Sequence, residues 1–441
     1  MALRAGVAEL KITPPVGMDL TGYADREGPS TTVHDDLWCR GLVLDDGATR
    51  LGIVALDLLG VDFPLDAAIR REAAPAGGLA PECLLVNCSH THAGPAVARL
   101  TSLGSPNEAY IASLPGKVAE VMGLAAGRLA QVSVTFGAAP VRVGINRRER
   151  TADGSIILGR NPEGIRDERV RVLDLRDGGG ETLAVIFNYA CHGTTMGGEN
   201  HEISAEWMGA ACQQLRTRLP GRPVPMFLQG CCGNINPERE HRGFDQVAQL
   251  GGRMADAVLA AAGSAQPVRA EPLRARLSRT ELSLQDPPSP EVARANLAQA
   301  EAAAKQVRQA GRHPYVVRAR DALVAYAQQI LRLSEAGERD YKLPFAVQAL
   351  AIGEVALVGL SGEVFFDFSG EIEAASPFAH TLVLGYSNGC TGYVPTPQAI
   401  AEGGYEPDAS FRYYETLPLA PAAGREMVVA AAGALREVAQ V

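Results

Sequence analysis

The stretch CLLVNCSHTHAGP, residues 83–95, joins a short apolar run to two histidines. The run has the length of a strand and is rich in leucine and valine, which favours a strand buried on both faces. His90 and His92 follow it directly, and Gly94 and Pro95 then end regular structure. The chain contains only 8 histidines, so two of them at the end of one buried strand call for a chemical explanation.

Other apolar runs end in polar, glycine-rich turns in the same way. They occupy residues 50–61, 182–193, 224–234, 354–363 and 380–389. Stretches with apolar residues at helical spacing lie between several of these runs, at residues 106–130, 206–219 and 244–263. The repeated order of strand and helix predicts an α/β fold, in which helices flank a layered mixed sheet.

Residues 289–335 differ from this pattern. Their pattern predicts two long amphipathic helices joined near Gly311 and Pro314, and apolar runs typical of strands resume after them. We therefore predict a helical hairpin inserted into one catalytic domain that spans residues 1–441. The apolar faces of these helices must be buried against something, so we expect the hairpin to cover or border a pocket.

The composition limits the kinds of partner. The 441 residues carry a net charge of −9, which argues against nucleic acid. The start lacks the pattern of a signal peptide, and no apolar stretch approaches the ~20 residues that cross a bilayer. We expect a cytoplasmic protein without a transmembrane segment, and a homo-oligomer is compatible with the sequence. The abundance of alanine, glycine and arginine is typical of a GC-rich bacterial gene.

Four side chains that can bind a metal follow four different apolar runs: His90, His192, Glu363 and Tyr393. Ligands of open α/β sheets bind beyond the carboxyl ends of the strands. Two histidines and a carboxylate are the ligands of many catalytic zinc sites. In an extended chain, His92 would point to the same side as His90. The competing interpretation is two core histidines and a glutamate in an exposed turn, and spacing alone leaves both open.

A series of motifs resembles the neutral/alkaline (non-lysosomal) ceramidase family. In chain order they are AGVAELKITPPVGMDLTGYA (5–24), SHTHAGP (89–95), INR (145–147), ACHGTTMGGENHEISAEWMG (190–209), GNINP (233–237), SGE (361–363) and SNGCTGYVPTPQAIAEGGYE (387–406). The resemblance runs from about residue 5 to about residue 410, and the helical hairpin is not part of it. HTHxGP and CHGT are its most specific motifs.

The resemblance implies one catalytic zinc ion per chain, held by the same four residues, His90, His192, Glu363 and Tyr393. It also places His92, Arg147, Glu206 and Tyr405 at active-site positions. His34 matches a further family histidine, and Asp57 could orient a histidine ligand.

The chain departs from the family pattern in one loop. The family loop reads Gly-Asp-x-Ser-Pro, whereas Asn234 and Asn236 stand here in place of the aspartate and the serine. An amide cannot act as a nucleophile, but it can donate a hydrogen bond to an oxyanion. The C-terminal β-sandwich domain of known ceramidases is also absent from this sequence, so we expect a substrate other than a lipid drawn from a membrane.

These observations predict a zinc-dependent hydrolase that cleaves the carboxamide bond of an N-acyl amine with metal-activated water. His92, Tyr405 and Asn236 would stabilise the tetrahedral intermediate, and Glu206 or His92 would move a proton to the leaving amine. One alternative is an esterase or lactonase that uses the same zinc site. A second is a metal-containing binding protein without catalysis. Cys231 and Cys232, on the same loop as Asn236, offer the one covalent alternative.

Overall fold

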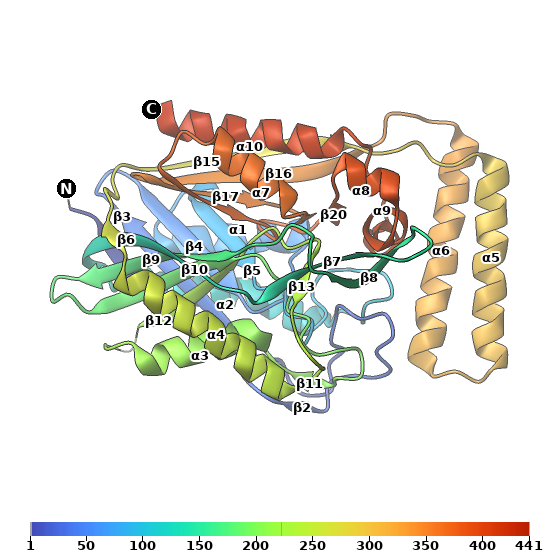
Figure 1. The fold of residues 1–441 in the computed structure, drawn as a ribbon, viewed down its shortest axis with the longest axis horizontal. Coiled ribbons are helices and arrows are strands. Elements are labelled where there is room, and N and C mark those ends of the chain that lie inside the picture. Colours follow the sequence, from blue (N-terminus) through green and yellow to red (C-terminus); the bar gives the residue numbers. More distant parts are fainter. Residues whose placement is uncertain (1, 222, 441) are drawn as a thin grey trace.

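Two mixed sheets pack face to face in the part of the chain that the computed structural model describes, residues 2–221 and 223–440 (Figure 1). The larger sheet has the order β12-β10-β9-β6-β1-β3-β4-β5, with β14 beside β6. Its strands are β1 (Arg4–Lys11), β3 (Trp38–Asp45), β4 (Arg50–Leu56), β5 (Leu84–Cys88), β6 (Ala130–Pro140), β9 (Arg169–Asp177), β10 (Thr182–Tyr189), β12 (Val224–Gln229) and β14 (Gln266–Pro267). The smaller sheet, ordered β15-β16-β17-β19, consists of β15 (Leu273–Ser283), β16 (Lys342–Ile352), β17 (Val355–Leu360) and β19 (His380–Leu384).

Helices cover the outer face of each sheet. The larger sheet packs against α1 (Phe63–Gly77), α2 (Glu108–Ala126), α3 (Glu206–Arg218) and α4 (Phe244–Gly263). The smaller sheet packs against α7 (Asp367–Ala375) and α10 (Ala423–Gln440). Apolar side chains such as Leu42, Ile186 and Leu350 fill the space between the sheets. This layering confirms the predicted α/β fold, in which helices flank a layered mixed sheet.

The apolar runs form strands that pair in parallel with one another. β4 pairs with β5, β10 with β12, and β17 with β19. These strands are almost entirely buried, because each lies between a helix layer and the facing sheet. The other ladders of the larger sheet are antiparallel, which the order of strands and helices did not predict. Each parallel pair brings two carboxyl ends to the same edge.

Buried amides join the edges of the sheets where these ends meet. Asn87 of β5 accepts from the backbone N–H of Gln229 at 2.8 Å and donates to the carbonyl of Gly385 at 2.8 Å. The side-chain amide of Gln229, at the end of β12, donates to the carbonyls of Ser89 (2.9 Å) and Cys191 (2.8 Å). Gln229 therefore ties the residue before His90 to the residue before His192.

The helical hairpin consists of α5 (Pro290–Gln309) and α6 (Pro314–Ala336), at the right of Figure 1. Pro314 starts α6, where a missing N–H costs nothing, and Gly337 ends it in a left-handed conformation. The hairpin is inserted between β15 and β16, whose facing ends Ser283 and Lys342 are register partners. Two adjacent, antiparallel chain segments therefore join the hairpin to the two sheets.

Short elements complete the fold around the strand ends. They are β2 (Thr32–Val33), η1 (Pro81–Cys83), β7 (Gly144–Arg150), β8 (Ile156–Asn161), β11 (Glu202–Ile203), β13 (Ile235–Pro237), β18 (Glu363–Val364), β20 (Tyr393–Val394), α8 (Pro397–Glu402), α9 (Tyr405–Asp408) and η2 (Ser410–Tyr414). Among the described residues, no helix has the length and apolarity needed to cross a membrane.

Candidate metal centre

Three histidines meet where the parallel strand pairs end. His90 and His92 follow β5, and His192 follows β10. All three are buried, and one ring nitrogen from each lies within 4.8 Å of the other two. Glu363 joins them from β18, and Tyr393 is its register partner on β20. The structure thus brings together imidazoles and a carboxylate from three separate segments, with Tyr393 beside Glu363 in the ladder.

The distances between these side chains fit a small metal ion. The Nε2 atoms of His90 and His92 are 3.2 Å apart, and Oε2 of Glu363 lies 3.3 Å from Nε2 of His90 and of His192. Ligand atoms of a tetrahedral ion with bonds of ~2.0–2.1 Å are about 3.3 Å apart. The cluster therefore has the spacing of neighbouring ligands around one tetrahedral ion.

Backbone carbonyls fix the tautomer of each histidine. Nδ1 of His90 contacts the carbonyl of Leu59 at 2.7 Å, that of His192 contacts the carbonyl of Cys232 at 2.7 Å, and that of His92 contacts the carbonyl of Gly22 at 3.1 Å. A carbonyl can only accept, so Nδ1 carries the proton and Nε2 is left to face the centre. Three Nε2 atoms without a proton and a carboxylate oxygen then lie close to one another, and these are donor atoms that a metal ion can bind.

The two histidines of the HTH motif meet for a reason that differs from the one predicted. His90 has a φ of 62°, in the left-handed region, so the chain is not extended at this point. The side chains do not share a face through strand alternation. A sharp turn after β5, together with the bond from the His92 N–H to the Gly193 carbonyl (3.0 Å), directs the rings toward each other. Conformations of this kind persist where surrounding contacts determine them.

Arg147 and two tyrosines form the side of the site that faces the histidines. Nη1 of Arg147, on β7, lies 3.3 Å from Nε2 of His192, and Nε donates to Glu406 at 2.8 Å. The Arg147 guanidinium carbon lies 5.2 Å from the ring centre of Tyr393 and 5.7 Å from that of Tyr405. Nη2 of Arg147 is buried and has no hydrogen-bond partner within the described chain. A ligand or a water molecule in this space could satisfy the buried donor.

Asn236 lies beside Arg147 and Thr194. Its Oδ1 accepts from Arg147 at 3.4 Å and from the Thr194 hydroxyl at 3.5 Å. These contacts occupy the carbonyl end of the amide. The N–H groups of Asn236 therefore remain for a ligand.

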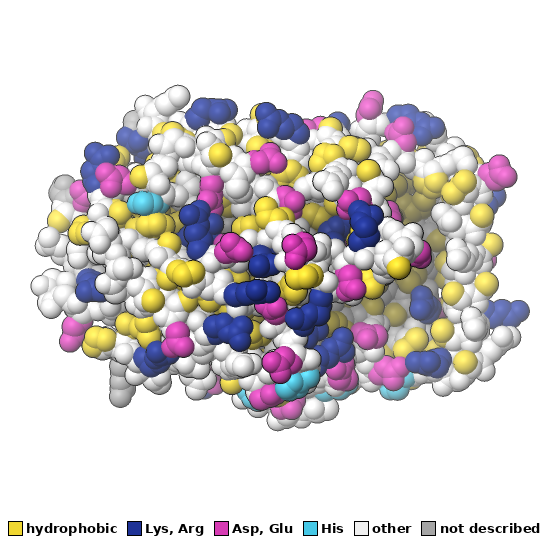
Figure 2. Space-filling view, viewed as in Figure 1, with side chains coloured by type: hydrophobic (Ala, Val, Ile, Leu, Met, Phe, Trp, Pro, Cys, Tyr) yellow, Lys and Arg dark blue, Asp and Glu magenta, His cyan; other side chains and the backbone are white. Residues whose placement is uncertain are grey.

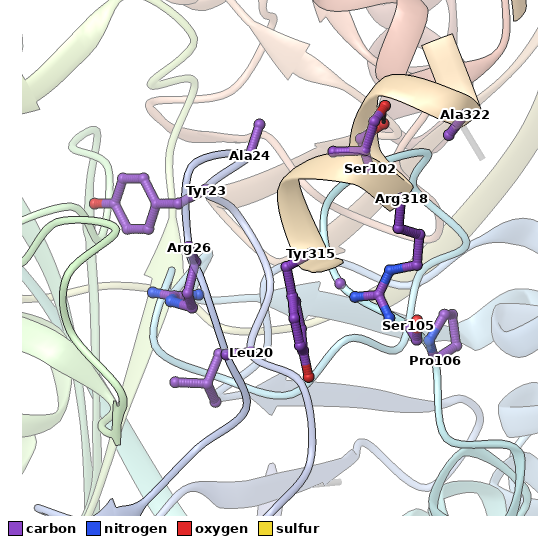
Figure 3. A pocket seen from close by; sticks show the side chains of 13 residues that line it. Leu20, Tyr23, Ala24, Arg26, Ser102, Ser105, Pro106, Tyr315, Arg318 and Ala322 are labelled. Atoms are coloured by element: carbon purple, nitrogen blue, oxygen red, sulfur yellow. Dashed lines mark hydrogen bonds between the residues drawn. The ribbon is translucent and has the colours of Figure 1, made fainter. Parts of the chain in front are cut away.

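The loop around Tyr23 separates the histidines from two cavities that the hairpin borders. The rings of Tyr23 and His92 are 5.1 Å apart, and Arg26 donates to the His92 carbonyl at 2.8 Å. A cavity of about 210 Å³ lies on the other side of this loop, and Figure 3 shows Tyr23 pointing away from the α6 residues Tyr315 and Arg318 that line it. A second cavity of about 270 Å³ lies between the same loop, α6 and Tyr413.

Comparison with known proteins places the chain in a family. The family model described as "Neutral/alkaline non-lysosomal ceramidase, N-terminal" matches residues 3–238, more than half of the chain. The chain belongs to this ceramidase family. Membership in it supports a hydrolase that acts on an amide bond.

Solved structures show the same fold beyond the matched residues. The neutral ceramidase of Pseudomonas aeruginosa is 21% identical, with a TM-score of 0.75 over 99% of this chain and 75% of that one. A structure described as ceramidase complexed with C2 is 19% identical, with a TM-score of 0.76 over 99% of this chain and 76% of that one. The ceramidase fold therefore extends over both sheets and the hairpin of this family member.

The Glu206 carboxylate of this ceramidase-family site bonds to the backbone, and among the described residues it has no hydrogen bond to the histidine rings. Its carboxylate accepts from the backbone N–H groups of Thr195 (3.1 Å) and Met196 (3.0 Å). Burial raises the pKa of Glu206, and these backbone bonds oppose the shift. Glu206 thus holds the loop that follows His192.

Two other residues considered from the sequence also lie apart from the rings. Asp57 accepts from Arg40 at 2.9 Å in a buried ion pair. His34 stacks on Phe244 at 3.6 Å near the surface. Neither side chain contacts the three histidines within the described part of the chain, and the carbonyls described above orient the rings instead.

The two adjacent cysteines are poor nucleophiles. Both are buried, and burial raises the pKa of Cys231 to about 12 and that of Cys232 well above its usual value. The thiol of Cys232 donates to the hydroxyl of Tyr386 at 3.2 Å. Both side chains therefore stay as thiols near neutral pH.

Sequence reasoning missed three residues around the centre. Tyr386 and Tyr414 contact Glu363, and Glu406 pairs with both Arg147 and Arg148. Tyr386 lies inside a predicted apolar run, and its hydroxyl could have signalled a buried polar contact. Tyr414 carries no such signal, because only the folded chain brings η2 beside Glu363.

We expect metal binding to be insensitive to pH in the neutral range. Burial lowers the pKa of His192 from 6.5 to about 4, and it also lowers the pKa of His92 well below its usual value. A lowered imidazole pKa keeps these side chains neutral, and Tyr393 would bind as the neutral phenol because burial raises its pKa well above the usual value. Protons therefore compete with the metal only at acidic pH. The dissociation constant, measured by chelator competition, should stay constant from about pH 8 to about pH 6 and rise as pH falls toward about 4. A tenfold rise between pH 7 and pH 6 would contradict this prediction.

Proposed function

We propose that this ceramidase-family member is a zinc-dependent hydrolase that cleaves the carboxamide bond of an N-acyl amine, with water as the nucleophile. The observation that carries the proposal is the set of Nε2 atoms and a carboxylate oxygen that face one another at 3.2–3.3 Å. In this proposal His90, His192 and Glu363 hold one zinc ion together with Tyr393, which the family motifs assign and which is the register partner of Glu363. His92 faces the same space without binding the ion. When bound, zinc supplies Lewis acidity to a carbonyl and lowers the pKa of a water molecule.

The residues on the opposite side have the chemistry to stabilise negative charge. Asn236 offers its amide N–H groups, Arg147 offers the unpartnered Nη2, and Tyr405 lies with its ring 5.8 Å from that of Tyr393. Donors fixed around a developing oxyanion are a large source of rate enhancement. Asn236, Tyr405 and His92 are the residues we assign to the tetrahedral intermediate.

The leaving amine requires a proton, and Nε2 of His92 is placed to relay it: this nitrogen carries no proton at rest, takes one from the attacking water and passes it to the amine. Nδ1 of His92 is held by the Gly22 carbonyl, and its Nε2 faces the centre 3.2 Å from that of His90. The Glu206 carboxylate accepts from the backbone N–H groups of Thr195 and Met196. These bonds favour a role in positioning the loop that follows His192. This division assigns proton transfer to His92 and loop geometry to Glu206.

The test is an activity panel on purified protein of known zinc content. We expect about one zinc ion per chain and turnover of N-acyl amines that removal of zinc abolishes. Esters with the same acyl groups test the alternative that the protein is an esterase. Faster turnover of esters than of amides in the zinc-loaded protein would favour an esterase, and an absence of turnover across the panel would favour a binding protein.

We expect the hairpin to set substrate preference. α5, α6 and η2 border a groove of about 610 Å³, visible at the right of Figure 2 as a hollow with hydrophobic side chains. Because Ser283 and Lys342 are register partners, a short turn can replace residues 287–339 without moving the strands. This variant should change the relative kcat/KM of long-chain and short-chain N-acyl amines more than its zinc content. Unchanged kinetics in a folded variant would show that the hairpin takes no part in substrate binding.

A further inference from the structure

Two tyrosine hydroxyls hold the two oxygens of Glu363. Tyr386 donates to Oε2 at 3.2 Å, and Tyr414 donates to Oε1. Oε2 is also the atom that faces Nε2 of His90 and His192. Each carboxylate oxygen therefore has its own phenol, and the orientation of the carboxylate is fixed from both sides.

Tyr386 contacts two of the proposed ligands at once. Its ring lies against that of His90, with the centroids 4.0 Å apart, while its hydroxyl reaches Glu363. Its φ of 49° is in the left-handed region, which is unfavourable for a bulky side chain. The bond from its N–H to the Gly362 carbonyl (3.1 Å) and from the Cys232 thiol to its hydroxyl (3.2 Å) hold this conformation. Strained backbone of this kind clusters at functional sites.

Tyr414 reaches the same carboxylate from a different part of the fold. It ends η2 and packs against an apolar cluster formed by Leu59, Ala98, Leu100 and Leu103. The carbonyl of Leu59 is the group that orients His90. One small cluster therefore supports the outer contacts of both Glu363 and His90.

We propose that Tyr386 and Tyr414 are positioning residues that hold Glu363 as a metal ligand through its two oxygens. The proposal rests on the metal site of the proposed function and deepens it. Outer partners of this kind fix the direction of a ligand, and their removal typically weakens metal binding ~10–100-fold. Hydroxyl donors also share the negative charge of the carboxylate, so the ion keeps more of its Lewis acidity.

The experiment measures the zinc dissociation constant of the full chain by chelator competition. Tyr414→Phe and Tyr386→Phe remove only the hydroxyl and keep the ring, and each should weaken zinc binding about 10–100-fold. Tyr413→Phe is the matched control for zinc binding. It lies on the same η2 segment, and its hydroxyl has no hydrogen bond within the described residues. It should change the dissociation constant less than about twofold, well below the effect of losing an outer partner.

Two further measurements separate positioning from general stability. Addition of zinc should raise the midpoint of thermal unfolding less in Tyr414→Phe than in the unsubstituted chain, whereas Tyr413→Phe should keep the full rise. In a Glu363→Ala background, which keeps the three histidines, Tyr414→Phe should weaken zinc binding less than about twofold, because its partner is gone. Wild-type affinity in both phenylalanine variants, or an undiminished effect in the Glu363→Ala background, overturns the proposal.

The outcomes for the two proposals are distinguishable. If the unsubstituted chain binds no zinc, both the proposed zinc chemistry and the positioning role are wrong. If it binds zinc with the expected losses in the phenylalanine variants but cleaves no amide, the proposed function is wrong and the positioning role stands.

Discussion

We expect His192→Ala to lose bound zinc and amide hydrolysis together. Nε2 of His192 lies 3.3 Å from the Glu363 carboxylate, and its Nδ1 is fixed by the Cys232 carbonyl at 2.7 Å. The loss in zinc affinity should exceed the ~10–100-fold that an outer partner contributes, because a ligand itself is removed. Zinc per chain and kcat/KM are measured on the same preparation.

His380→Ala is the matched control for this variant. His380 begins β19, and its ring stacks on Phe136 at 3.9 Å, at the end of the strand away from the centre. It should keep full zinc content and activity. Full metal occupancy in His192→Ala, or in the corresponding His90→Ala variant, would show that the ligand assignment is wrong.

We expect Asn236→Ala to lower kcat by about 10²–10³, as loss of one oxyanion donor does in a protease. Its carbonyl end is engaged by Arg147 and Thr194, so the N–H groups are the donors that the proposal assigns to the oxyanion. Asn236→Asp keeps the acceptor and lacks the donor, and it should be at least as slow. Zinc content should not change in either variant, because Asn236 is not an assigned ligand.

The same variants test the identity of the nucleophile. If water attacks, mass spectrometry during turnover should show only the unmodified chain. The raised pKa of Cys232 and its contact with Tyr386 make a thiolate unfavourable. An acyl group on Cys231 or Cys232, or an Asn236→Ala variant with unchanged kcat, would contradict the mechanism.

The sequence predicted the parts of this site that depend on local pattern. Short runs without alternation indicate strands buried on both faces, and polar residues at their ends mark the carboxyl edge. The side chains of His90, His192 and Glu363 were selected in this way and do lie together. The motif resemblance added Arg147 and Tyr405, which spacing alone would not have selected.

The parts that the sequence could not predict depend on contacts between distant segments. The two facing sheets are joined by Asn87 and Gln229, polar residues inside apolar runs whose partners are known only from the fold. Tyr414 lies 51 residues beyond Glu363 and has no periodic signal. Glu206 fits the family motif, yet backbone amides satisfy its carboxylate.

The amide contacts that close the sheet edges have a consequence for synthesis. A chain emerging from the ribosome would complete all three histidines long before β17, β18 and β19 exist, and these supply Glu363 and the Gly385 carbonyl that Asn87 needs. Contacts of such large sequence separation form late and slowly. The order of translation therefore exposes the three imidazoles first, and the carboxylate that completes the cluster arrives only with the second sheet.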